Sequence, residues 1–287
     1  MMRDRITSTS NVTKERRKKS FVKMLWILLS IVVFVIGLAF LSHLDDMLIK
    51  DISVSGNKIL KEEDIKEETF KVLSKKRFLV FAGENKLIYS KKDLEEGLKK
   101  SFPRILSIQI NSEGKKLLFT IVERERAHLW CGEEPPTYDE RTKERNCYFL
   151  DNGGFIFDTS PLFSSGVYFT FYSKIEDGDP IGQHIFNFDF LKDMELLITG
   201  VNDEGFPVHS LVAKEEGQYE LLFNMATVSK DYPKLLFTSD QSIGEVYNKF
   251  ISIVQEDPFK TDFIEKPNRL EYIDARFKNR IFYRFTE

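Results

Sequence analysis

The 287-residue sequence has little of what metal sites and nucleophilic active sites are usually built from. It contains only two cysteines and four histidines. The histidines have no metal-ligand spacing among themselves: His43, His128, His184 and His209. The sequence also lacks a Gly-x-Ser-x-Gly elbow and a Walker-type phosphate loop. We therefore expect a protein that is not an enzyme, with no catalytic residue, no metal, no cofactor and no small-molecule substrate.

Beyond the N-terminal tail the chain has no excess of positive charge. Residues 1–23 hold eight basic and two acidic side chains, a net charge of +6, so the remainder carries −9 within a total of −3. A nucleic-acid-binding protein would place its positive charge on the folded domain, so we exclude nucleic acid as a partner. A hydrophobic content of 42% and a charged content of 30% are typical of a globular protein.

An uncharged run, Met24–Leu41, is long enough to cross a membrane. As a helix it measures ~27 Å, and three more residues, through Leu44, bring it to about the 30 Å of a hydrocarbon core. The positive-inside rule predicts that the basic tail, residues 1–23, is cytoplasmic and that everything after the helix of residues 24–44 is extracytoplasmic. We expect the tail to have no fold of its own, because it shows no apolar periodicity. The alternative is a cleaved signal peptide, which has a shorter core of ~7–15 residues. The sequence "FLSHLDD" offers no small-x-small cleavage site, so we favour an uncleaved anchor.

Residues 49–126 have the pattern of one small domain, in the order β-α-α-β-β. Ile52 and Val54 alternate with serines as in a strand, and Gly56-Asn57 is a turn dipeptide. Ser90 begins the second helix with a capping-box-like pattern. We expect three strands covered by two helices, with the helices and the last two strands at Lys61–Lys75, Ser90–Phe102, Ile105–Asn111 and Leu117–Glu123.

Residues 127–287 are dense in aromatic residues and in short strand-like runs. Helices are expected around Leu191–Thr199 and within "SIGEVYNKFISIVQED", and the C-terminus is expected to form a hairpin with its turn at Lys278-Asn279. The sequence thus predicts an α+β protein, in which an N-terminal transmembrane helix and the first domain precede a mainly β domain with helices on one side. Most aromatic side chains should be core, and a minority could form an exposed docking strip.

The two cysteines, Cys131 and Cys147, bracket a polar, charged segment. Outside the cytoplasm a disulfide between them is chemically allowed, and closing a loop of this size would contribute roughly 3 kcal/mol. The alternative is two unpaired cysteines, buried in the fold.

Several motifs, in their order and spacing, resemble the FtsQ/DivIB family of bacterial division proteins. The resemblance is carried by Ile52-x-Val54-x-Gly56-Asn57, Phe102-Pro103, Val122-Glu123-Arg124 with Trp130, the Asp151, Gly154 and Phe157 turn, and "YIDARFKNRIFYRF". The chain departs from the family at Arg126 and Ala127, where proline is usual, and at 131–147, which looks like an insertion. The stretch 173–266 matches only in broad pattern.

This resemblance implies a POTRA domain at 49–126, a β domain at 127–287 and a place in the inner membrane at the division septum. It implies a bitopic scaffold of the divisome that recruits small single-pass proteins, FtsB-like and FtsL-like, by strand addition near the C-terminus. An alternative is a POTRA-containing component of a secretion or envelope-assembly system. A membrane-anchored envelope enzyme is a third possibility, and it would need a convergent polar site.

The C-terminal hairpin, Leu270–Phe285, is the predicted docking site, because a sheet edge offers unpaired backbone groups to an incoming strand. Positive charge on the hairpin could pair with an acidic segment of the partner. The candidate partner-binding residues are Tyr272, Arg276, Phe277, Arg280 and Phe282, and Lys278 and Arg284 add to the positive charge. Their alternative role is to close the core of the sheet.

Overall fold

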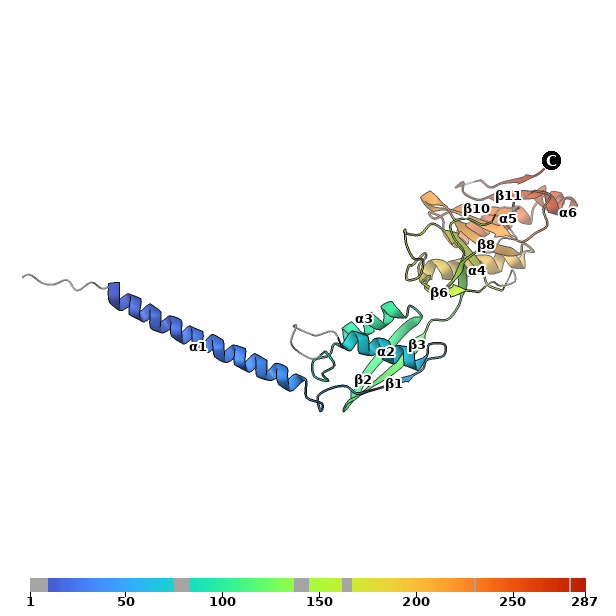
Figure 1. The fold of residues 1–287 in the computed structure, drawn as a ribbon. Coiled ribbons are helices and arrows are strands. Elements are labelled where there is room, and N and C mark those ends of the chain that lie inside the picture. The colour runs from blue at the N-terminus through green and yellow to red at the C-terminus, as the bar shows by residue number, and fades with distance from the viewer. Residues whose placement is uncertain (1–9, 75–82, 137–144, 162–166, 230, 279) are drawn as a thin grey trace, which may run out of the picture. The chain divides into compact units, whose positions relative to one another are not determined.

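A computed structural model describes residues 10–74, 83–136, 145–161, 167–229, 231–278 and 280–287, and of residues 10–17 it describes the backbone alone. Contacts divide the chain into two units, which are described separately. Unit 1 runs to Ser101 and includes Ser107–Val122, and unit 2 comprises Phe102–Leu106 and Glu123–Glu287. Figure 1 shows the elements of both units in chain order.

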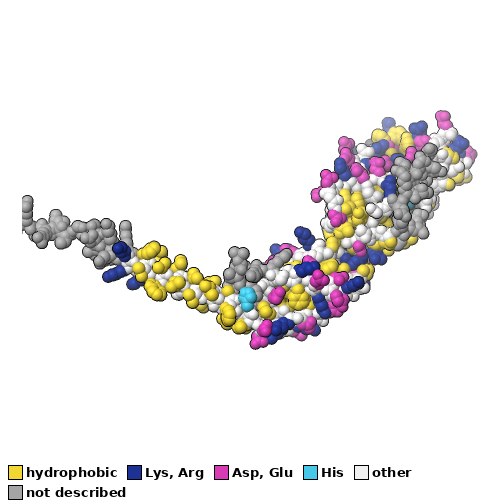
Figure 2. Space-filling view, in the orientation of Figure 1, with side chains coloured by type: hydrophobic (Ala, Val, Ile, Leu, Met, Phe, Trp, Pro, Cys, Tyr) yellow, Lys and Arg dark blue, Asp and Glu magenta, His cyan; other side chains and the backbone are white. Residues whose placement is uncertain are grey.

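An N-terminal helix, α1 (Ser10–Ser42), dominates the start of unit 1. Within its apolar part, Lys18–Ser42, an 18-residue window has a mean hydropathy of 2.9 and no buried residue. Figure 2 shows hydrophobic side chains along this helix and basic ones at its N-terminal end. The helix is compatible with a single-pass membrane protein. Helix α1 begins at Ser10, so residues 10–23 of the expected tail continue the helix of the apolar run, and Lys and Arg readily continue a helix even without apolar periodicity.

The rest of unit 1 is a three-stranded sheet with two helices, in the order β1-α2-α3-β2-β3. The strands lie in the order β1-β3-β2, and β1 pairs parallel to β3, with Ile52 opposite Leu117. Ser90 accepts a hydrogen bond from the amide of Asp93 at 3.2 Å, so it caps α3 as its sequence pattern predicts. The elements are β1 (Asp51–Ser55), α2 (Glu62–Leu73), α3 (Lys91–Ser101), β2 (Ile105–Glu113) and β3 (Lys116–Glu123). Lys75, the expected end of α2, lies outside the described residues.

Unit 2 is built on a nine-stranded mixed sheet in the order β12-β11-β10-β9-β8-β7-β4-β5-β6. Pairs β4–β7, β7–β8 and β10–β11 are parallel, and antiparallel pairs fill the rest. The strands are β4 (His128–Trp130), β5 (Cys147–Leu150), β6 (Ile156–Ser160), β7 (Thr170–Ser173), β8 (Val208–Ala213), β9 (Gln218–Phe223), β10 (Lys234–Thr238), β11 (Leu270–Asp274) and β12 (Phe282–Phe285).

Three helices of unit 2, α4 (Phe188–Asp203), α5 (Ile243–Val254) and α6 (Phe259–Glu265), bury their apolar faces in one core with the sheet. Met194, Phe250 and Phe259 are fully buried there, each on a different helix. A smaller cluster around Phe149 and Leu222 lies on the opposite face of the sheet. The two 3-10 turns are η2 (Glu215–Gly217) and η3 (Pro267–Arg269). The α+β class and the apolar N-terminal helix predicted from the sequence are thus confirmed, and the expected mainly β part is built on a large mixed sheet.

Candidate partner-binding edge of the large sheet

The C-terminal strand β12 forms one edge of the nine-stranded sheet, and β6 forms the other. The β6 edge is partly covered by the chain itself, since the amide of Ile156 donates to Gln183 O at 2.9 Å and Ile156 O accepts from Gly182 at 2.8 Å. Within the described part of the chain, no segment pairs with the outer side of β12. The sheet therefore has one protected edge and one open edge.

The backbone of β12 has two residues whose polar groups point outward. Thr286 donates its amide to Arg269 O at 2.8 Å, so its backbone faces β11. Because successive residues of a strand alternate in direction, Arg284 and Phe282 also face β11, whereas the N–H and C=O groups of Tyr283 and Phe285 face the open side. These two residues offer hydrogen bonds to a tenth strand.

Two aromatic side chains, Phe277 and Phe282, form a contacting pair at this edge. The rings of Phe277 and Phe282 meet edge to face, with centroids 5.1 Å apart, while 50% and 45% of the two residues stay exposed. Tyr283 packs its ring against Phe259 of α6, so the alternate residue Phe282 lies on the face opposite the helices. The edge thus combines an apolar spot with open backbone groups.

The connection between β11 and β12 is held in place by side chains from the α5 region. Gln241 donates to Ala275 O at 2.8 Å, and Lys249 donates to Phe277 O at 3.0 Å. Arg276 forms two bonds to the carboxylate of Asp274, at 2.9 and 2.6 Å. Since this hydrogen-bonded carboxylate favours the charged guanidinium, it raises the pKa of Arg276.

The five predicted residues differ in their exposure and in their contacts. Phe277 and Phe282 touch, and Arg280 is exposed in the same hairpin. Tyr272 is half-buried in β11, opposite Arg284 of β12. Arg276 is already engaged by Asp274, so its geometry suits a positioning role more than direct charge pairing. Asn279, half of the predicted turn, lies outside the described residues.

Sequence reasoning missed the backbone of Tyr283 and Phe285, because only the hydrogen-bond pattern tells which residues of a strand point outward. It counted Arg284 among the positive charges of the hairpin but not among the candidate partner-binding residues. Arg284 is 65% exposed in its side chain and lies 3.0 Å from Glu271, on the same face as Phe282. Once the register of the hairpin is known, the alternation of side chains in "FYRF" indicates that Phe282 and Arg284 lie on the same face.

Cys131 and Cys147 form a disulfide in the structure, at a sequence separation of 16. Cys131 follows β4 directly, and Cys147 begins β5, the antiparallel neighbour of β4. The bridge therefore ties the ends of two paired strands at the base of the inserted segment, of which residues 137–144 lie outside the described part.

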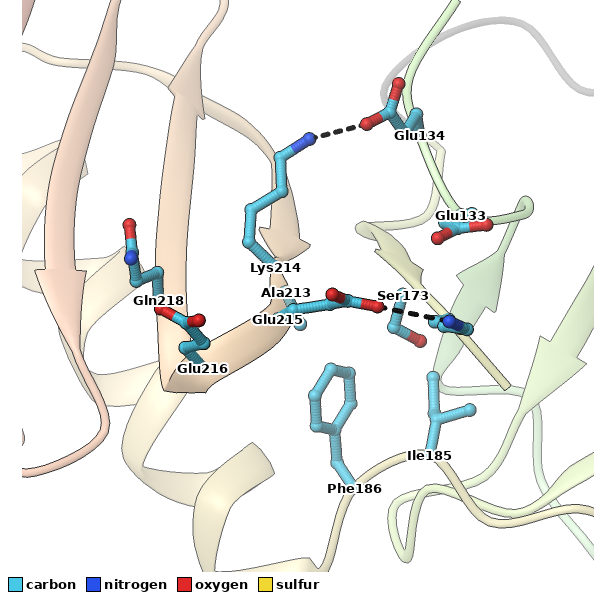
Figure 3. Close-up of a pocket in the computed structure, with 11 residues that line it drawn as sticks. Glu133, Glu134, Ser173, Ile185, Phe186, Ala213, Lys214, Glu215, Glu216 and Gln218 are labelled. Carbon is cyan, nitrogen blue, oxygen red and sulfur yellow. Dashed lines mark hydrogen bonds and ion pairs between the residues drawn. The ribbon is translucent and has the colours of Figure 1, made fainter. Parts of the chain in front are cut away.

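A cavity of about 560 Å³ lies beside the turn between β8 and β9 (Figure 3). Two of its carboxylates form ion pairs, with Lys214 2.8 Å from Glu134 and Lys174 3.1 Å from Glu215. Ser173 also lines it, and its hydroxyl accepts from the indole of Trp130 at 3.2 Å. Among the described lining residues, no histidine stands beside this serine to activate it.

The motif residues of the β5–β6 turn act in packing. Asp151 accepts hydrogen bonds from the amides of Gly153 and Phe155 and forms an ion pair with Arg124. The guanidinium of Arg124 stacks 4.0 Å from the ring centre of Phe155. Gly154 has a φ of +78°, and a Cβ there would lie 2.2 Å from the carbonyl oxygen of Phe186. This geometry explains an Asp and a Gly at these positions by turn chemistry alone.

One histidine is buried in the core of unit 2. His128 lies edge-on against Phe171, with centroids 5.2 Å apart, and its Nε2 is 3.5 Å from a Glu195 oxygen. Burial lowers the pKa of His128, because the charged imidazolium would lose its hydration, and the nearby carboxylate of Glu195 opposes this shift. Across the described residues, no group of three or more potential ligands could hold a metal ion.

Comparison with known families matches residues 17–137 to the model described as "Putative stage IV sporulation protein YqfD". The match covers 121 of the 287 residues, from the apolar helix to the segment after Cys131. No curated protein matches the chain. The sequence resemblance to the FtsQ/DivIB family was therefore wrong: the family model that matches is YqfD. The motifs misled because residues such as Asp151 and Gly154 follow from turn geometry, which unrelated families share.

Proposed function

We propose that this protein is a bitopic scaffold of the inner membrane, which recruits other single-pass membrane proteins by binding one of their extended segments. In this proposal α1 spans the membrane with its basic end in the cytoplasm, unit 1 is a POTRA-type domain and both units are extracytoplasmic. The observation that carries it is the open edge of β12, beside the exposed pair of Phe277 and Phe282.

The edge specifies the chemistry of the segment that it would bind. A strand added to β12 would hydrogen-bond to the backbone of Tyr283 and Phe285. On the face opposite the helices its side chains would neighbour Phe282 and Arg284, which are two residues apart. A fitting segment therefore carries an apolar residue and an acidic residue in an i, i+2 pattern. The side-chain hydrogen bonds that hold Ala275 and Phe277 favour binding, because less order has to be created there.

Alanine at Phe277 or Phe282 tests this site. Each ring leaves about 100 Å² exposed, so its burial by a partner contributes roughly 2 kcal/mol, or about thirtyfold in Kd. The matched control is Ile264→Ala on α6, which removes an apolar side chain that is 70% exposed on another element of unit 2. Equal effects of the three variants on the recruitment of partners would contradict the proposal.

The assembly that we propose is the cell-division machinery at the septum, with small single-pass membrane proteins as partners. A second candidate is an envelope-assembly system used in sporulation, which the match of residues 17–137 to the YqfD family favours. Depletion in the host separates the two. Filaments without septa support the division assignment, whereas normal division with defective spores or envelopes supports the second candidate and refutes the first.

A further inference from the structure

Two exposed leucines lie where α1 meets the rest of unit 1. Leu44 lies two residues after the end of the helix and is 42% exposed, and Leu87 is 77% exposed. Leu87 belongs to the segment Glu84–Tyr89, here named the membrane-side loop, which is remote in sequence from α1. A leucine that is mostly open to water brings no packing to its own domain, so its surroundings decide what it does.

Asn85 fastens the membrane-side loop to the end of the helix. It is 2% exposed, and its side-chain amide donates to Ser42 O, the last residue of α1, at 2.9 Å. The same side chain accepts the amide of Leu87 at 2.9 Å. Helix C-termini leave carbonyl groups without intrahelical partners, and Asn85 satisfies one of them while fixing the backbone of Leu87.

Two backbone bonds double this connection. Ile49 donates to Glu84 O and Lys86 donates to Met47 O, both at 2.9 Å. The chain leaving the helix and the membrane-side loop thus pair side by side, and Ile49 is buried at 3% exposure. Leu87 comes two residues after Asn85, whose side chain bonds to the end of α1, so Leu87 cannot move far from that end.

We infer that the membrane-side loop rests on the outer surface of the bilayer and inserts Leu87 among the phospholipid head groups, with Leu44 beside it. The inference rests on the proposed membrane span. The helix end marks the boundary of the hydrocarbon layer, and an apolar side chain fastened at that boundary is buried by lipid. Lys86, next to Leu87, brings a positive charge to the level of the lipid phosphates. The contact would fix the orientation of unit 1 on the membrane, which a single helix alone does not do.

Fluorescent labels test the insertion in the full-length chain. Leu87→Cys, Leu44→Cys, Ile59→Cys and Val33→Cys are labelled one at a time with an environment-sensitive NBD group in phosphatidylcholine vesicles that contain spin-labelled lipid quenchers. The native cysteines form a disulfide and do not react with the label. Ile59 is the matched control, because it is 55% exposed in unit 1 but lies beyond the far end of β1, ~13 Å or more along the strand direction.

The inference predicts blue-shifted, strongly quenched emission at positions 87 and 44, and water-like, weakly quenched emission at 59. Asn85→Ala should reduce quenching at 87 and leave it unchanged at 33. Quenching at 33 together with water-like emission at 87 would overturn the inference and spare the membrane span. Water-like emission at 33 would overturn the span itself. Labels at 87 and 59 that are quenched equally would also reject a specific role for Leu87.

Discussion

Gly154→Ala should destabilise unit 2 far more than the same substitution at another glycine with a positive φ. An alanine at φ +78° costs about 1–2 kcal/mol through its left-handed conformation. The new Cβ would also lie 2.2 Å from Phe186 O, so that segment has to move. The movement threatens the bond from the amide of Ile185 to Gly154 O, 3.0 Å long, and the neighbouring bond between Ile156 and Gln183, at about 1 kcal/mol each.

The expected loss for Gly154→Ala is therefore about 3–4 kcal/mol. Gly205→Ala is the matched control, with a φ of +86° and nothing within 4 Å of the added Cβ, and it should lose only about 1–2 kcal/mol. Guanidinium unfolding in detergent, followed by the fluorescence of Trp130 in a Trp26→Phe background, measures both. Losses that agree within about 0.5 kcal/mol would refute the argument that the close approach to Phe186 adds to the backbone strain.

Three further perturbations probe the interior and the surface of unit 2. Replacing Cys131 and Cys147 together with serine should cost about 3 kcal/mol, read as a lower melting temperature that reductant no longer changes. Because the folded pKa of His128 lies below its unfolded value, stability should fall as the pH drops from 7 through the folded pKa, and His128→Gln should flatten this dependence in urea titrations. An unaltered pH profile would reject the buried, neutral imidazole. Arg124→Met should cost about 3 kcal/mol because it leaves the buried carboxylate of Asp151 without its ion-pair partner, whereas Lys174→Met, in an exposed pair, should leave the melting temperature nearly unchanged.

Local signals in the sequence predicted the elements well. The apolar run gave the helix, Ser90 gave the cap of α3, and alternation gave β1. The start of α1 at Ser10 was missed, because a charged stretch shows no apolar periodicity even when it continues a helix. The parallel pairing of β7 with β4 and β8 was not predicted either, since long-range strand order leaves no local pattern.

The candidate site was predictable in position but not in detail. The hairpin was expected at a sheet edge, and β12 lies at one edge of the nine-stranded sheet. Which side chains stay open depends on partners remote in sequence. Arg276 looked available from its charge, yet Asp274 engages it, and Phe282 is open only because Tyr283 takes the side facing Phe259. The family assignment failed for a related reason, since short turn motifs report local geometry more than ancestry.

The most direct test of the scaffold is photo-crosslinking at the open edge in living host cells. A photoreactive phenylalanine analogue at position 282 or 277 should form a discrete adduct with a single-pass membrane protein, mapped to an extended segment with an apolar and an acidic residue two positions apart. The same analogue at position 264 on α6, where the native side chain is more exposed, should form none. Absence of adducts at both 282 and 277, or the same adducts from 264, would contradict binding at the β12 edge.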